Sequence, residues 1–246
     1  GADYDPAILA IAKQRLHAMS DAEQILLEQN IIAGLPGGEG SYDREGIRKA
    51  IAEFIALGNE GMRANLFAFL EAVIPVAEEA GVRMCIHPDD PPFSLFGLPR
   101  VVSTADDARA LMSAVPSVNN GLTLCAGSFG AREDNDLVAM VREFGPQIHF
   151  VHLRNIKREA DGSFYDSEHL DGDNDMVGLI SALLDEEDAR KDQGRTDSIP
   201  MRPDHGHLLG DEIEQANVNP GYSFGGRLKG LAELRGVIHT LEHLRR

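Results

Sequence analysis

Four residues of metal-binding type each follow a short apolar run in this chain: His87, Cys125, His152 and Asp204. Each run has the length of a buried β-strand, so each of these residues is expected where a strand gives way to a loop. In an α/β barrel the carboxyl ends of the strands face the catalytic mouth. Four neighbouring strands would therefore direct these side chains toward one point, and the sequence predicts a metalloenzyme.

The predicted ligand set indicates the class of metal. Two imidazoles, one thiolate and one carboxylate balance the charge of a divalent ion, and the mixture suits Mn²⁺, Fe²⁺, Co²⁺ or Zn²⁺ and not Ca²⁺ or Mg²⁺. Taken singly, each residue has an ordinary interpretation, since a lone His is more often structural and a lone Cys is often a small buried hydrophobe. The prediction depends on the coincidence at four successive strand ends.

Three further residues could take part in chemistry beside such a metal. His205 directly follows Asp204, is expected to point roughly to the other face, and could act on a substrate as an acid or base. Tyr222 lies in the loop after that strand, where its phenol could transfer a proton or could simply be a packed ring. Arg154 could bind a substrate carboxylate through its guanidinium fork, or could form a surface salt bridge.

Composition limits the class of protein. The 246 residues are 43% hydrophobic and 26% charged, enough to bury a substantial core. The net charge of −17 argues against nucleic-acid binding and, more weakly, against an anionic membrane surface. No apolar run approaches the roughly 18 residues that span a bilayer, and no signal-peptide pattern opens the chain. We expect a cytoplasmic protein with reduced cysteines that acts on a small molecule.

The elements expected to position these residues change in character along the chain. Residues 1–80 read as helical, with helices that begin at a capping box at residues 20–23 and that cover residues 42–57 and 62–80. Strands are then expected at residues 82–87, 122–125, 148–153 and 199–204. Helices are expected from residue 103 or 104, at about 135–144, at 175–191 and around 228–241. Such alternation predicts a parallel sheet with right-handed crossovers.

The strand count bears on the domain organisation. We predict a single α/β domain over residues 1–246, with a helical segment at 1–80 and the C-terminal half of a TIM-type (β/α)8 barrel at 81–246. Only four strands are evident, whereas the closed barrel has eight. A four-stranded open sheet is the alternative, but it would leave two edges exposed. An incomplete barrel is favoured.

Several longer motifs closely resemble the mannonate dehydratase family. They lie at residues 82–92 (VRMCIHPDDPP), 97–100 (GLPR), 135–138 (NDLV), 199–207 (IPMRPDHGH), 219–223 (NPGYS) and 226–233 (GRLKGLAE). The resemblance implies a xylose-isomerase-like barrel, longer at its N-terminus in family members. It also implies dehydration of D-mannonate to 2-dehydro-3-deoxy-D-gluconate in glucuronate catabolism, with Mn²⁺ or Fe²⁺. The implied metal ligands are His87, Cys125, His152 and Asp204, and the implied proton-transfer residues are His205 and Tyr222.

The resulting hypothesis is a hydro-lyase that acts on a sugar acid, with Arg154 on the substrate carboxylate. A homo-oligomer is expected, because enzymes of this kind commonly associate. The first alternative is another metal-dependent barrel enzyme, such as a sugar isomerase or a phosphodiester-cleaving endonuclease. The endonuclease is disfavoured by the charge of −17. The second alternative is a non-catalytic fragment or binding protein that keeps the fold.

Overall fold

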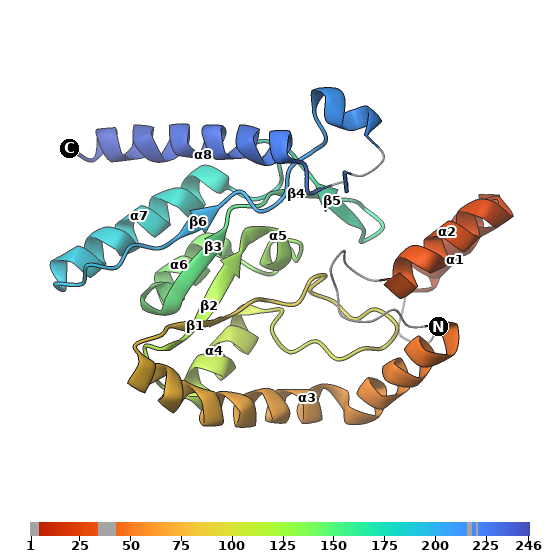
Figure 1. Cartoon of the computed structure of the whole chain (residues 1–246), viewed down its shortest axis with the longest axis horizontal. Helices are drawn as coiled ribbons and strands as arrows, with labels where there is room; N and C mark the ends of the chain where they lie inside the picture. The colour runs from red at the N-terminus through yellow and green to blue at the C-terminus, as the bar shows by residue number, and fades with distance from the viewer. Residues whose placement is uncertain (1–4, 34–42, 216–217, 220) are drawn as a thin grey trace. The chain divides into compact units, whose positions relative to one another are not determined.

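The computed structural model describes residues 5–33, 43–215, 218–219 and 221–246 (Figure 1). The first residue of the helix predicted at 42–57, and Pro220 of the motif at 219–223, lie outside the described residues. The chain divides into two compact units, residues 1–62 with 94–99 and residues 63–93 with 100–246. The prediction of a single domain over the whole chain stays a prediction.

The first unit is helical, as expected from its sequence. It contains α1 (Pro6–Ala18), α2 (Asp21–Ala33) and the first part of α3 (Arg44–Ala80). The predicted capping box at the start of α2 is present, because the Ser20 amide donates to Glu23 Oε2 at 2.7 Å and the Glu23 amide donates to Ser20 Oγ at 3.4 Å. Within α3, Gly58 has φ of 67° and interrupts the helical backbone, close to where the sequence divides into two helices.

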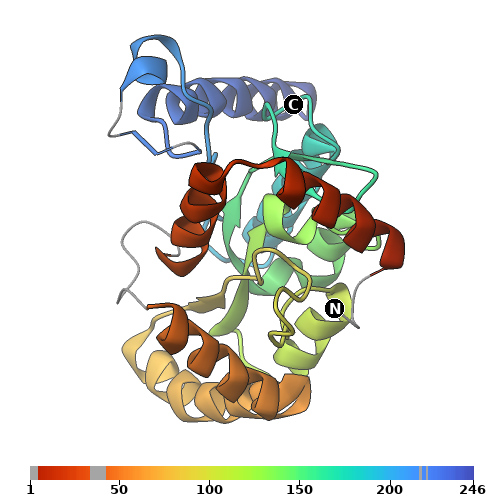
Figure 2. The same ribbon diagram turned by 90° about the vertical axis from the view of Figure 1, so that its right-hand side faces the viewer.

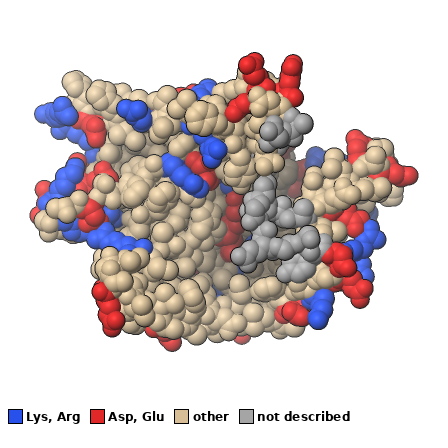
Figure 3. Space-filling view, in the orientation of Figure 1, with Lys and Arg blue, Asp and Glu red and all other residues tan. Residues whose placement is uncertain are grey.

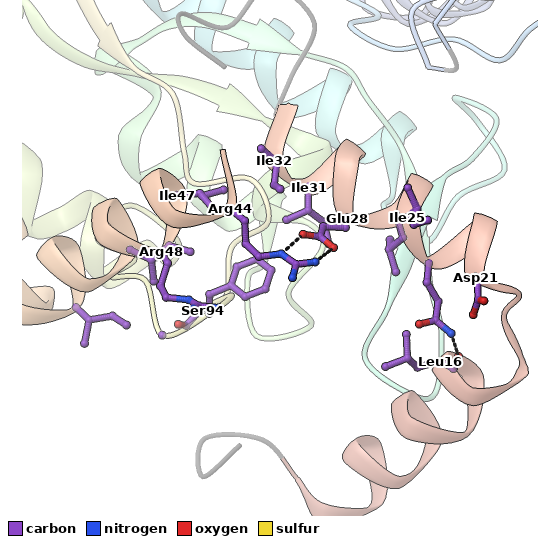
Figure 4. Close-up of a pocket in the computed structure, with 16 residues that line it drawn as sticks. Leu16, Asp21, Ile25, Glu28, Ile31, Ile32, Arg44, Ile47, Arg48 and Ser94 are labelled. Atoms are coloured by element: carbon purple, nitrogen blue, oxygen red, sulfur yellow. Dashed lines mark hydrogen bonds and ion pairs between the residues drawn. The ribbon is translucent and has the colours of Figure 1, made fainter. Parts of the chain in front are cut away.

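A pocket of about 1470 Å³ lies in this first unit (Figure 4). Half of the side chains that line it are Leu or Ile, and an ion pair between Glu28 and Arg44 lies among them. None of the residues predicted to do chemistry lines it.

The second unit is built on a parallel sheet in the order β1-β2-β3-β6. Its strands are β1 (Met84–Ile86), β2 (Asn120–Cys125), β3 (Ile148–His152) and β6 (Met201–Arg202). The crossovers carry α4 (Ala105–Ala114), α6 (Leu137–Phe144) and α7 (Met176–Asp192), and α8 (Phe224–Leu244) follows β6. Helix α6 packs on α7 and α7 on α8, so the helices follow the sheet in chain order (Figures 1 and 2). The prediction of an α/β fold with a parallel sheet is confirmed.

The core explains why the strands are short and apolar. All six residues of β2 are buried, and Leu122, Leu124 and Val151 are fully inaccessible to solvent. A parallel strand covered on both faces needs a continuous apolar run and not an alternating one. In the described part of the chain, no helix combines the length and apolar character that crossing a bilayer requires.

The helix starts follow local sequence signals. Thr104 caps α4 in a capping box with Asp107, which agrees with the predicted start at residue 103 or 104. Helix α8 begins earlier than predicted, because the Ser223 hydroxyl accepts a hydrogen bond from the Gly226 amide at 2.8 Å and so caps the first turn.

Several shorter elements were not predicted. The segment between the strand predicted at 148–153 and the helix predicted at 175–191, where no element was predicted, forms an antiparallel hairpin of β4 (Ile156–Arg158) and β5 (Phe164–Asp166). A short helix, α5 (Ala126–Phe129), directly follows β2, and 3₁₀ turns lie at Gly145–Gln147 and Gly210–Glu214.

The last strand is shorter than predicted. Pairing in β6 ends at Arg202, so the expectation that the strand runs to Asp204 is wrong. Pro203 has no amide hydrogen to continue the ladder. Asp204 then adopts φ of 70°, which turns the chain away from the extended conformation.

Candidate metal and proton-transfer site

Three of the four predicted metal ligands come together in the second unit. One donor atom from each of His87, Cys125 and His152 lies within 4.8 Å of the other two. The two imidazoles are the nearest pair, with His87 Nε2 3.2 Å from His152 Nδ1. The structure therefore holds a His/Cys/His group that could bind a metal ion.

Strand register accounts for this convergence. Cys125 and His152 are the last residues of β2 and β3 and lie opposite each other in the parallel ladder. His87 follows β1, the strand on the other side of β2. Because all strands of a parallel sheet end at the same edge, three consecutive strand ends place their side chains together.

The surroundings of these donors suit a transition-metal ion. His87 Nδ1 is 2.7 Å from the Pro88 carbonyl oxygen, so Nδ1 carries a hydrogen and donates it to that oxygen. The lone pair of His87 is then on Nε2, the nitrogen that faces the cluster and could bind a metal ion. Cys125 is fully buried, and the Ser128 hydroxyl donates to its Sγ at 3.2 Å. Imidazole nitrogen and thiolate sulfur are ligands of borderline divalent ions, so the three side chains fit such an ion.

Asp204 lies beside these three residues but is not one of those whose donor atoms all lie within 4.8 Å of one another. Its Oδ2 is 3.4 Å from His152 Nδ1, and its Oδ1 accepts a hydrogen bond of 2.7 Å from the Arg202 guanidinium. The carboxylate is 9% exposed, so it is directed into the molecule. Asp204 is therefore within reach of the cluster through His152.

His205 and Tyr222 form a second pair next to Asp204. Nε2 of His205 is 3.7 Å from Asp204 Oδ2, so the expectation that His205 points away from Asp204 is wrong. The physical reason is the positive φ of Asp204, since alternation of side chains requires an extended backbone. The rings of His205 and Tyr222 lie 4.9 Å apart at 53°, and a parallel bridge between Gly206 and Tyr222 brings the tyrosine there.

Arg154 is buried and bound by acidic side chains of the same chain. Its Nε donates to Asp166 Oδ1 at 2.6 Å and its terminal NH donates to Asp90 Oδ2 at 2.5 Å. Burial by itself lowers the pKa of Arg154, but the two carboxylates outweigh it and hold that pKa above its ordinary value. The alternative interpretation of Arg154 as a surface salt bridge is wrong, because only 6% of the residue is exposed.

Asp166 is the residue of this region that the sequence did not indicate. Its Oδ2 is 2.8 Å from His205 Nδ1, while its Oδ1 binds Arg154. Burial raises the pKa of Asp166, but the hydrogen bond from His205 and the charge of Arg154 have the larger combined effect and lower it. No local pattern marks Asp166, because it reaches the site through the unpredicted hairpin. Asp90 did carry a signal, since it belongs to the motif that contains His87.

The chain resembles known proteins over nearly its whole length. The family model described as D-mannonate dehydratase (UxuA) matches residues 5–246. The mannonate dehydratase of Saccharophagus degradans is 68% identical over 246 residues, which are 100% of this chain and 62% of that protein. Mannonate dehydratase 2 of Agrobacterium fabrum is 61% identical over 240 residues, 98% of this chain and 60% of that protein.

A solved structure shares the fold. The crystal structure of mannonate dehydratase from Streptococcus suis serotype 2 matches with a TM-score of 0.73 and 32% identity, over 87% of this chain and 58% of that one. The predicted fold, an α/β barrel of which this chain holds part, is confirmed. The chain spans about three fifths of the length of the curated relatives it matches.

Proposed function

We propose that this chain, which belongs to the D-mannonate dehydratase (UxuA) family, catalyses the dehydration of D-mannonate to 2-dehydro-3-deoxy-D-gluconate. The observation that carries the proposal is the His87, Cys125 and His152 group inside the matched region. We further assign Asp204 as the fourth ligand, because its carboxylate lies beside His152 and is directed inward. The proposed ion is Mn²⁺ or Fe²⁺, which when bound supplies a Lewis acid that stabilises negative charge on substrate oxygens.

His205 and Tyr222 are the proposed acid and base. The reaction removes the proton from the carbon next to the carboxylate, and the neighbouring hydroxyl leaves as water after it gains a proton. The resulting enol then becomes the ketone. The imidazole and the phenol have ring centres 4.9 Å apart, so one can take the first proton while the other supplies the second.

The remaining predictions concern substrate binding, oligomeric state and location in the cell. The role of Arg154 with the substrate carboxylate stays a prediction and requires its ion pair with Asp90 or Asp166 to open. On the face in Figure 3, the described Lys and Arg side chains are interspersed with Asp and Glu and form no continuous stripe, which favours a small substrate over a nucleic acid. The homo-oligomer and the cytoplasmic location stay predictions.

Two cysteines in neighbouring strands allow a matched test. Cys125 belongs to the donor group, whereas Cys85 lies in β1 and is a free thiol outside that group. The full chain would be loaded with Mn²⁺, its metal content measured by elemental analysis, and D-mannonate turnover followed by chromatography of the 2-oxo acid. We expect about one ion per chain, lost in Cys125→Ser and retained in Cys85→Ser, with turnover following the metal.

Three outcomes would contradict the proposal. Stoichiometric metal without turnover of D-mannonate would exclude this substrate, and conversion of a neutral aldose without loss of water would favour a sugar isomerase. Equal metal content in the two serine variants would show that Cys125 is not a ligand.

A further inference from the structure

The least expected feature beside the site is a continuous chain of charged contacts that ends on His205. Asp90 binds Arg154, Arg154 binds Asp166, and Asp166 binds Nδ1 of His205, with distances of 2.5, 2.6 and 2.8 Å. Charge-assisted hydrogen bonds of this length are the strong ones in proteins. The last contact leaves only Nε2 of His205 to face Asp204 and the metal-binding group.

The contact with Asp166 determines which nitrogen of His205 carries the hydrogen. An ionised carboxylate only accepts hydrogen bonds, so a nitrogen 2.8 Å from it must be the N–H of the ring. In the neutral imidazole the hydrogen is then on Nδ1 and the lone pair is on Nε2. A proton that passes through His205 therefore enters and leaves at Nε2, on the side of Asp204.

Arg154 in turn fixes the orientation of the Asp166 carboxylate. Each oxygen has its own partner, Oδ1 with Arg154 and Oδ2 with His205. The Arg154 side chain has little freedom, because a Cβ added to Gly127 would lie 2.3 Å from its Cδ and its terminal NH is bound to Asp90. The two ends of the guanidinium are thus held by groups from different parts of the fold.

The hairpin supplies the support for Asp166. Asp166 ends β5 and pairs with Ile156 of β4, and the next amide, that of Ser167, donates to the Asn155 carbonyl at 3.0 Å. The Asn155 side chain is 1% exposed and donates to the His169 carbonyl at 3.0 Å. A buried hydrogen-bonded base of this kind holds the tip of β5 in one place.

We propose that Asp166 is a positioning residue that fixes the orientation and the Nδ1–H tautomer of His205, and that Arg154 acts by holding Asp166. This inference rests on the proposed function for its effect on turnover, but its structural part does not. It gives Arg154 a role in supporting the proton-transfer residue, which is separate from its predicted role on the substrate carboxylate.

The variant Asp166→Asn tests the inference with a sharp expectation. Its side-chain oxygen will stay with the Arg154 guanidinium, because that contact is charge-assisted, and its NH₂ group will face His205 Nδ1. Nδ1 of His205 must then accept a hydrogen bond from this NH₂ group, so the ring hydrogen of His205 moves to Nε2. The lone pair is then lost from the side of Asp204.

The readout is the ¹⁵N–¹H NMR spectrum of the imidazoles of the full chain at a pH where they are neutral, without paramagnetic metal. The chain has nine histidines, so His205→Asn identifies the signal. We expect Nδ1–H in the wild type and Nε2–H in Asp166→Asn. The matched control is Asp173→Asn, which alters another carboxylate that contacts an arginine, Arg158, at 3.6 Å. It should leave His205 unchanged.

Kinetics of the Mn²⁺-loaded chain supply the second readout. We expect kcat to fall on the order of 10²–10⁴-fold in Asp166→Asn with little change in KM. The double variant Asp166→Asn/His205→Asn should match His205→Asn within about threefold, since the two residues act as a unit. Multiplication of the two single effects would overturn the inference.

The NMR measurement tests the tautomer of His205 independently of catalytic activity. If the wild type shows Nε2–H on His205, or if Asp166→Asn leaves the tautomer unchanged, the inference is overturned whatever the activity. If the chain shows the expected tautomers but no turnover, the proposed function fails and the positioning contact stands. Should Asp166→Asn not fold, the wild-type spectrum alone decides.

Discussion

Acid is expected to weaken the fold through one buried residue, His149 of β3. It is 9% exposed, and its Nε2 is 2.7 Å from the Val118 carbonyl oxygen, so Nε2 carries the hydrogen. Its Nδ1 is buried and has no hydrogen-bond partner among the described residues. A second proton would therefore add an unpaired charged N–H to the interior. Burial is the main cause that lowers the pKa of His149 to about 4, and neighbouring arginines add to it.

The sign and size of the effect follow from the two pKa values. The folded value of about 4 lies below the ordinary value of 6.5, so as the pH falls the unfolded chain takes up this proton first. The stabilisation is complete above pH 6.5 and is lost between pH 6.5 and about 4. At about 1.4 kcal/mol per pKa unit the full loss is about 3 kcal/mol, of which about 2 kcal/mol is lost between pH 7 and pH 5.

Urea unfolding at several pH values measures this loss. The chain should be kept free of metal with a chelator, because the candidate ligands also titrate. Wild type is compared with His149→Gln, and His239→Gln, which alters an exposed residue of α8, is the control. From pH 7 to pH 5 the free energy of unfolding of the wild type should fall by about 2 kcal/mol more than that of His149→Gln. If the two pH profiles run parallel within about 0.5 kcal/mol, the reasoning about His149 is refuted.

Two further substitutions test packing and capping, and urea unfolding at neutral pH measures both. Gly127→Ala places a Cβ 2.3 Å from the Cδ of Arg154 and should destabilise the fold by roughly 1–3 kcal/mol. In the control Gly236→Ala, in α8, the added Cβ meets nothing within 4 Å, so this change should be neutral or stabilising. Equal effects of the two substitutions on the free energy of unfolding would argue against the clash. Thr104→Ala removes the capping box of α4 and should lower the free energy of unfolding by about 1 kcal/mol. The control Ser113→Ala, in the last turn of α4, should change it by less than about 0.5 kcal/mol. A loss of similar size in both variants would contradict the role of the cap.

Sequence alone determined the strands of the parallel sheet, the helices between them and most of the strand ends. Apolar runs predicted β1, β2 and β3 because buried parallel strands need them, and the donors at their ends, Cys125 among them, were visible in the same windows. The start of α4 at residue 103 or 104 and the end of α3 at residue 80 were also predicted. Both depend on neighbouring residues only, the cap Thr104 and Gly81, which has φ of 66°.

Tertiary structure decided how the residues around His205 contact one another. Asp166 and His205 are 39 residues apart, and Arg154 and Asp90 are 64 apart. No periodicity or turn chemistry encodes contacts over such separations, because they depend on the path of the chain around the whole sheet.

The direction of the His205 side chain was also not predictable from the sequence, although it depends on adjacent residues. Alternation along a strand predicted that it would point away from Asp204, but Pro203 ends the ladder and Asp204 adopts φ of 70°. A backbone conformation of this kind is sparsely populated for residues other than glycine, and it persists because the surrounding fold imposes it. The sequence by itself thus placed the metal-binding types at the strand ends, and the packing of loops and hairpin determined how His205 faces them.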